Sequence, residues 1–199
     1  MSEVLTLVPE HDGARLALEN LLADAEVGVP AARILEPIYE VRGDHEHHIR
    51  ALRVLHDGSA DGQERLELLT KIGSVYHERI GDAAKAFAAL AEALRGAPES
   101  EETLGRLEIL AAEREAFPEL VALVQELAGA VEDPVLSRTL WIKAATMQDS
   151  QLGDVDGAVG SYLKCLDIDA GDLEILGALE ALYRRTSRWR DLVGVLRRR

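Results

Sequence analysis

The residues best suited to chemistry lie in the stretch Asp44-His45-Glu46-His47-His48, where three imidazoles and two carboxylates are close together. Ligands of these kinds bind Zn²⁺ or Ni²⁺, so a metal-responsive regulatory module using His45, His47 and His48 is one hypothesis. A histidine run at the start of one helix, however, has no ligands at a second spacing. We therefore expect no metal site and no cofactor.

Two other features suggest chemistry more weakly. The run DIDAGD at residues 167–172 resembles the start of a calcium-binding loop, but Gly171 stands where an acidic or amide ligand is required. We expect an interhelix turn there. Cys165 has no sequence signal for a nearby base, so we expect a small buried packing residue. With no nucleophile elbow, phosphate-binding glycine loop or His-Glu-x-x-His motif, the sequence predicts no catalytic residues and no enzyme activity.

The composition limits which fold and partners are expected. Of the 199 residues, 47% are apolar, 4% are aromatic and 29% are charged, and strictly alternating apolar runs are missing. This pattern favours an all-α fold. The formal net charge of −14 repels phosphate backbones, so we expect no nucleic-acid partner.

The sequence gives only indirect information on location. No apolar run approaches the roughly 18 to 20 residues that cross a bilayer, so we expect no membrane partner. The single cysteine cannot form an internal disulfide, which fits a reducing compartment. We expect a cytoplasmic protein.

The chain repeats itself at an offset of 72 residues, without a gap. Pairs that match at this offset include Gly81 with Gly153, Ala86 with Ala158, Leu120 with Leu192 and Leu35 with Leu107. In this register His45 takes the place of Phe117 and Trp189, and His48 that of Leu120 and Leu192. The register therefore predicts packing roles for these two histidines and an outward position for His47.

Apolar spacing and capping residues predict about 11 helices. Their expected ranges are 12–24, 30–42, 44–56, 61–80, 83–96, 100–114, 117–130, 134–150, 155–168, 172–185 and 188–199. Five residues are expected to act as equivalent hinge points at the ends of helices: Gly43, Gly81, Glu115, Gly153 and Ser187. Successive hinge points are 38, 34, 38 and 34 residues apart. Paired helices at such a period predict an α-solenoid of antiparallel hairpins.

Two of these hairpins resemble the tetratricopeptide repeats. The residues that match the family signature are Leu69, Ile72, Gly73, Tyr76, Ala86, Leu90 and Pro98 in the first copy, and Trp141, Ala144, Ala145, Gln148, Ala158, Tyr162 and Ala170 in the second. One extra residue before Gly81 and before Gly153 departs from the pattern, and we expect it to lengthen the first helix. The resemblance implies a right-handed α-α superhelix over residues 1–199.

The same resemblance implies a non-enzymatic scaffold that binds a protein segment on its concave face. The residues expected there are Glu67, Thr70, Ser74, His77, Glu78, Glu102, Thr139, Thr146, Asp149 and Glu174. Family members that hold acidic chaperone tails use Lys and Asn, whereas this chain has Thr70, Ser74 and Thr146 at comparable places. We expect a polar or basic peptide partner instead.

Packing within the hairpins explains the many alanines. Small residues such as Ala86 and Ala158 let two helix backbones approach closely, so a larger side chain there should overpack the contact. The aromatic residues Phe117 and Trp189 are expected to pack at the hinges. For Trp189→Ala we expect a loss of roughly 3 to 5 kcal/mol.

The two ends of the chain suggest a further hypothesis. Residues 184–199 hold seven arginines against one acid, Asp191, and neither end has the polar capping helix usual in solenoids. We expect a fragment of a longer array, or association at the array ends. A self-assembling structural protein that uses the Arg-rich end is the second alternative to the scaffold.

Overall fold

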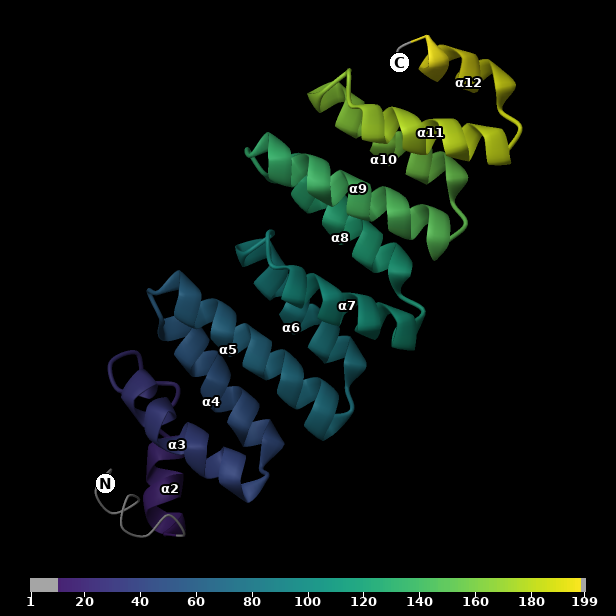
Figure 1. Ribbon diagram of the computed structural model, residues 1–199. Helices are drawn as coiled ribbons and strands as arrows, with labels where there is room; N and C mark the ends of the chain where they lie inside the picture. The colour runs from purple at the N-terminus through teal and green to yellow at the C-terminus, as the bar shows by residue number, and fades with distance from the viewer. Residues whose placement is uncertain (1–10, 198–199) are drawn as a thin grey trace. The chain divides into compact units, whose positions relative to one another are not determined.

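The computed structural model describes residues 11–197, and within that range it contains eleven α-helices, one π-helix and no strand (Figure 1). The elements are α2 (Asp12–Glu19), α3 (Gly28–Arg42), α4 (His45–Gly58), α5 (Gly62–Ser74), the π-helix η1 (Val75–Ile80), α6 (Ala83–Gly96), α7 (Glu101–Arg114), α8 (Phe117–Ala130), α9 (Pro134–Ser150), α10 (Val155–Ile168), α11 (Leu173–Arg185) and α12 (Trp189–Leu196). The all-α prediction is confirmed.

The chain divides into two compact units, one ending at Leu110 and the other starting at Ala111. In unit 1, helices adjacent in sequence pack together from α2 to α6; in unit 2 the same holds from α8 to α12. Short turns join these helices, so neighbours run antiparallel as hairpins (Figure 1). Each unit thus buries apolar residues between successive helices rather than around one central core.

All five expected hinge points have a left-handed backbone. The φ angles are 68° at Gly43, 76° at Gly81 and 63° at Gly153, and they are 54° at Glu115 and 57° at Ser187. A residue of this conformation ends a helix and turns the chain back, and glycine adopts it without a steric penalty. The prediction that Glu115 and Ser187 are equivalent to the three glycines is confirmed.

Aspartates begin the helices that follow the turns. The side chains of Asp44, Asp82 and Asp154 accept a hydrogen bond from the backbone N–H three residues on, and Asp133 accepts from Val135. Such N-caps satisfy amide groups that have no partner inside the helix. Aspartate caps are therefore present in both units.

The helix before Gly81 runs from Gly62 to Ile80, close to its predicted range of 61–80, and the extra residue is accommodated in a wider last turn. The helix that begins as α5 ends in six residues that form the π-helix η1. The amide of Asp82 donates to Tyr76 O at 2.9 Å. After α9, the amide of Asp154 donates to Gln148 O at 2.8 Å, the same six-residue span. A wider turn absorbs one residue without moving the start of the next helix.

One helix is shorter than expected. The range 12–24 was predicted, whereas α2 ends at Glu19 and turns follow it. The carboxylate of Asp24 accepts hydrogen bonds from the amides of Glu26 and Val27. This local turn leads the chain into α3 and competes with continuation of the helix.

The small residues predicted at the hairpin contacts are buried. Ala86 and Ala158 are 0% exposed, and Leu90 is 1% exposed. The expectation for one hinge aromatic is wrong, because Trp189 is 60% exposed while Phe117 is half-buried. Trp189 lies at the first residue of α12, and little of its ring is covered by unit 2.

Candidate functional site

A groove in unit 1 lies between α5 and the segment that joins α6 to α7. Its volume is about 640 Å³. Its lining residues are Gln63, Leu66, Glu67, Thr70, Lys71, Ser74, Ala93, Ala97, Glu99, Ser100, Glu102 and Thr103. Four of the residues predicted for the partner-binding face are among them: Glu67, Thr70, Ser74 and Glu102.

Hydrogen-bond acceptors dominate the polar lining of this groove. Glu67, Glu99 and Glu102 are exposed, and no ion pair recorded within residues 11–197 involves them. The hydroxyl of Thr70 donates its proton to Leu66 O at 2.9 Å, so its oxygen can act toward a further group only as an acceptor. The groove therefore offers acceptors to groups that carry N–H or O–H donors.

Two cations of the groove region were missed by the sequence reasoning. Lys71 lines the groove, but its ammonium lies 2.7 Å from Glu36 Oε1 and 3.0 Å from Glu40 Oε2. Arg106 donates from Nη2 to Ser74 Oγ at 2.7 Å. Both contacts join residues more than thirty positions apart, so no local pattern in the sequence indicates them. Lys71 thus has two carboxylate partners, whereas Arg106 contacts a neutral hydroxyl. Glu67, whose carboxylate accepts a hydrogen bond from Gln63 at 3.0 Å, Glu99 and Glu102 supply the acidic charge of the lining.

A smaller hollow of about 90 Å³ holds two more of the predicted residues, His77 and Glu78, together with Leu90, Arg106 and Leu110. It lies at the η1 end of the same hairpin. All six residues predicted in unit 1 thus line one of two hollows of the same hairpin region.

The four predicted residues of unit 2 lie on α9 and α11, and no described groove brings them together. Asp149 forms an ion pair with Arg185, and Glu174 forms one with Arg138 at 2.6 Å. Thr139 and Thr146 are exposed. Both of these predicted carboxylates therefore already have a cationic partner.

The three histidines at residues 45–48 do not converge on one point. His47 is half-buried; its ring stacks on Tyr39 with centroids 5.4 Å apart, and its Nδ1 lies 2.9 Å from Asp44 Oδ1. The expectation that His47 points outward is therefore wrong in part. His48 is 2% exposed, as its register with Leu120 and Leu192 predicts.

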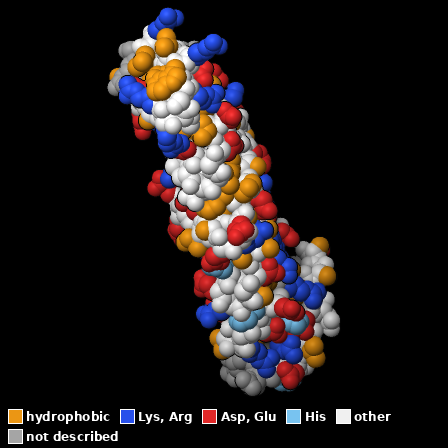
Figure 2. Space-filling view, turned by 90° about the vertical axis from the view of Figure 1, so that its right-hand side faces the viewer, with side chains coloured by type: hydrophobic (Ala, Val, Ile, Leu, Met, Phe, Trp, Pro, Cys, Tyr) orange, Lys and Arg blue, Asp and Glu red, His pale blue; other side chains and the backbone are white. Residues whose placement is uncertain are grey.

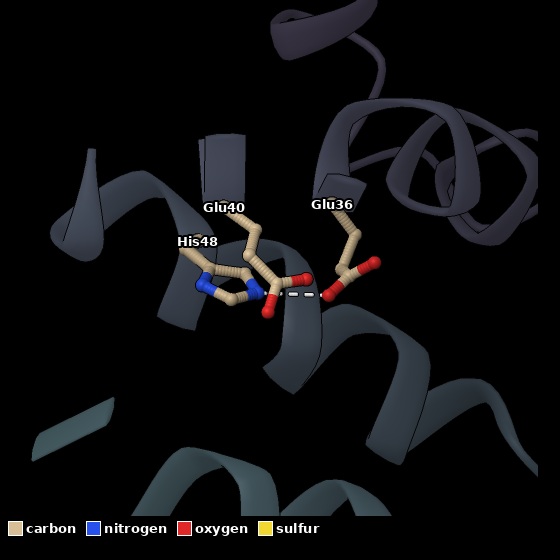
Figure 3. A group of neighbouring side chains, drawn as sticks. All are labelled: Glu36, Glu40 and His48. Atoms are coloured by element: carbon tan, nitrogen blue, oxygen red, sulfur yellow. Dashed lines mark hydrogen bonds and ion pairs between the residues drawn. The ribbon is translucent and has the colours of Figure 1, made fainter. Parts of the chain in front are cut away.

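The group that could hold a metal ion in the described residues is Glu36, Glu40 and His48, whose ligand atoms lie within 4.8 Å of one another (Figure 3). His48 Nε2 lies 2.8 Å from Glu36 Oε1 and must donate to it, since an ionised carboxylate only accepts. The Lys71 ammonium contacts both glutamates. A cation thus already neutralises this cluster, and its chemistry does not call for a metal.

These contacts stabilise the ionised form of Glu36. The hydrogen bond from His48 is the main cause, and Lys71 adds to it, so the pKa of Glu36 falls to about 2 despite partial burial of the carboxylate. The cluster joins α3, α4 and α5 through charge-assisted hydrogen bonds. Its role in unit 1 is structural.

The remaining chemical candidates behave as the sequence predicts. Cys165 is fully buried, and burial raises the pKa of its thiol to about 11, which disfavours a reactive thiolate. Residues 169–172 form the turn between α10 and α11, in which Asp169 accepts from the Gly171 amide and Asp172 caps α11. In the described residues no helix is both long enough and apolar enough to cross a membrane.

The sequence matches no protein-family model and no curated protein. Several solved structures resemble the fold. The structure of MamA is 18% identical with a TM-score of 0.43, covering 82% of this chain and 91% of that one. A tetratricopeptide repeat protein from Parabacteroides merdae is 14% identical with a TM-score of 0.42, covering 98% and 75%. The complex of the yeast Sti1 TPR2AB domain with an HSP90 peptide is 13% identical with a TM-score of 0.38, covering 99% and 86%.

Both units consist of helical hairpins closed by left-handed turns, with buried small residues at Gly73, Ala86 and Ala158. The fold is tetratricopeptide-like. Similarity at the level of these solved structures carries no function to this chain. That the chain binds no nucleic acid stays a prediction.

Proposed function

We propose that this tetratricopeptide-like protein is a non-enzymatic interaction scaffold whose unit 1 groove binds a basic segment of a partner protein. The sequence predicts binding either in a concave groove or at the array ends. Of these two, we propose the groove, between α5 and the start of α7. A cytoplasmic location and membership of a longer array remain part of the proposal, to be tested by localisation and by the length of the natural chain.

The acceptor character of the groove supports this proposal most directly. Glu67, Glu99 and Glu102 lie on the lining, and the Lys71 charge is balanced by Glu36 and Glu40. A segment that carries Lys or Arg would place its donors against these carboxylates. An acidic segment would meet like charges at these three carboxylates, and Lys71, the cation of the lining, already has two carboxylate partners.

The apolar part of the lining accommodates the stem of such a side chain. Leu66, Ala93 and Ala97 line the same groove as the carboxylates. Long basic side chains bury their methylene groups on apolar surface while the charged end reaches a polar group. Arginine suits the groove better than lysine, because its planar fork reaches two acceptors at once.

Fluorescence anisotropy with labelled peptides tests the proposal. An arginine-rich peptide of about ten residues should bind. A peptide of the same length with glutamate in place of each arginine should not. The triple variant Glu67→Gln, Glu99→Gln, Glu102→Gln should weaken binding by about threefold to a hundredfold, because exposed ion pairs each contribute about 0.2–1 kcal/mol.

A matched triple variant controls for the loss of net charge. Glu26, Glu46 and Glu132 are exposed and lie outside the groove, so their replacement by glutamine should change affinity by much less. Equal weakening in both triple variants would show general attraction to the acidic chain, and the groove proposal would then be abandoned. The metal-responsive and self-assembling alternatives have no supporting contact in the described residues, and we do not propose them.

A further inference from the structure

The helices that form the unit 1 groove have a second copy in unit 2. Helices α5, α6 and α7 begin at Gly62, Ala83 and Glu101, and α9, α10 and α11 each begin 72 residues later. The helices α6 and α10 also end at equivalent residues, Gly96 and Ile168. Each residue that lines the groove therefore has a defined counterpart in unit 2, as expected for two copies of one repeat.

In unit 2 an arginine of the chain itself occupies the equivalent place. Arg138 of α9 donates from Nε to Asp172 Oδ2 at 2.5 Å and from Nη2 to Glu174 Oε2 at 2.6 Å. One guanidinium thus binds two carboxylates at the start of α11. The hydrogen bond from Arg138 lowers the pKa of Asp172, so this carboxylate stays ionised.

In unit 1 the arginine is missing but the glutamate remains. Leu66 stands in register with Arg138, and Glu102 stands in register with Glu174. Both Leu66 and Glu102 line the groove of about 640 Å³. Charge pairing is common on the surface, where Figure 2 shows Asp and Glu side chains next to Lys and Arg side chains. No ion pair recorded within residues 11–197 involves Glu102, so this place has the acceptor without the donor.

The neighbouring residues of the groove also favour a cation. Ser100 stands where unit 2 has an aspartate, and its hydroxyl oxygen can accept a hydrogen bond. Glu67 and Glu99 line the groove and stand in register with the uncharged residues Thr139 and Gly171. Unit 1 therefore adds two carboxylates to a place from which the arginine has been removed.

We propose that an arginine of the bound segment places its guanidinium in unit 1 where Arg138 places its own in unit 2, against Glu102 and the Ser100 hydroxyl. This inference rests on the proposed function, and it adds which residue is recognised and where it binds. The site takes arginine rather than lysine, because an ammonium has no fork that contacts two acceptors in fixed geometry. In unit 2, Arg138 closes the equivalent place against a second ligand.

Leu66→Arg tests the position by supplying the guanidinium from the chain. It should compete with an arginine-rich peptide and weaken its binding in fluorescence anisotropy by about threefold to tenfold. Ala88→Arg adds the same charge at an exposed residue of α6 outside the groove, and should change affinity by less than about twofold at physiological salt. Equal affinity of the Leu66→Arg and parent chains would overturn the proposed position and leave groove binding intact.

Arg138→Leu makes the reverse change in unit 2. It leaves Asp172 and Glu174 without their guanidinium, so unit 2 should gain a place for a second arginine. Isothermal titration calorimetry should then give two peptides per chain instead of one. Lys164→Leu removes an exposed cation from its pair with Asp167 on α10 and should keep one peptide per chain. One peptide per chain for Arg138→Leu, in a protein that circular dichroism shows to be folded, would contradict the proposal.

A measurement without peptide separates this inference from the proposed function. By NMR, the Nε–H proton of the arginine introduced by Leu66→Arg should exchange with water about tenfold more slowly than that introduced by Ala88→Arg. Adding Glu102→Gln should reduce this protection. An unprotected Nε–H would overturn the proposed position whether or not peptides bind. Protection together with no peptide binding to the parent chain would refute the proposed function, while showing that the position accepts a guanidinium.

Discussion

Gly73 of α5 lies so close to Leu90 of α6 that a β-carbon at residue 73 would be 2.9 Å from both Cγ and Cδ2 of that leucine. Leu90 is 1% exposed, so it has little room to move. The two helices therefore approach at a distance that only a missing side chain allows. In the second copy Ala145 takes the corresponding position and is buried, so a methyl group fits there.

Close helix contact in the same hairpin predicts a strong dependence on side-chain size. Ala86→Leu should lower the free energy of unfolding by about 1–3 kcal/mol, because the added carbons overpack a fully buried site. Ala88 lies two residues on in the same helix and is exposed, so Ala88→Leu should leave stability within about 0.5 kcal/mol. Urea unfolding followed by circular dichroism compares the two variants. Equal losses would contradict the packing described for Ala86.

The left-handed turns predict opposite outcomes for two substitutions. Gly81→Ala should cost about 1–2 kcal/mol, because a β-carbon is disfavoured at a φ of 76°. Glu115→Gly removes a β-carbon from the same conformation, at a φ of 54°, and should cause no loss of stability. Thermal unfolding of the two variants measures the contrast. A destabilised Glu115→Gly protein together with an unaffected Gly81→Ala protein would refute the equivalence of the hinges.

Burial on α12 predicts which of its apolar residues stabilise unit 2. Leu192 is 7% exposed, and Leu192→Ala should cost about 2–5 kcal/mol. Trp189 is 60% exposed, so Trp189→Ala should cost under about 1 kcal/mol, well below the loss expected from the sequence. Denaturation midpoints show which of the two substitutions destabilises the protein more. A larger loss for Trp189→Ala than for Leu192→Ala would show that Trp189 is covered in solution.

The cluster around Glu36 predicts a dependence of stability on acid. The pKa of Glu36 is lowered to about 2 from 4.5, so its contribution is complete above about pH 4.5 and is lost as the pH falls toward about 2. Between about pH 5 and pH 3 the unfolding midpoint of the parent chain should therefore fall more steeply than that of Glu36→Gln.

Glu26→Gln serves as the control for this pH series, because Glu26 is exposed and lies outside the cluster. Its midpoint should follow that of the parent chain at each pH. If Glu36→Gln and the parent chain lose stability in parallel, the contacts from His48 and Lys71 do not hold the carboxylate in solution.

Local signals in the sequence predict most of the fold. The turn at Gly81 and the cap at Asp82 depend on conformational preferences of a few adjacent residues, and the 72-residue register extends them to Glu115 and Ser187. The register also predicts burial of His48 from its place among leucines. Each of these features can be predicted from adjacent residues or from the matching residues of the other repeat copy.

Tertiary contacts explain what the sequence does not predict. Lys71 is neutralised by glutamates 31 and 35 residues away, and Arg138 and Arg185 neutralise Glu174 and Asp149 from other helices. The helical position of a residue thus indicates the face on which it lies, but not whether its charge is free. The exposure of Trp189 likewise depends on whether another hairpin covers α12, which a comparison with Phe117 does not reveal.

Chemical-shift mapping by NMR tests the proposed groove most directly. An arginine-rich peptide is titrated into the ¹⁵N-labelled chain, and the backbone amides are followed. We predict that the largest shifts occur at the groove residues Glu67, Thr70, Ser74, Glu99 and Glu102 and saturate with one peptide per chain. Shifts that are absent, or that spread over the acidic surface without saturating, would contradict a binding groove in unit 1.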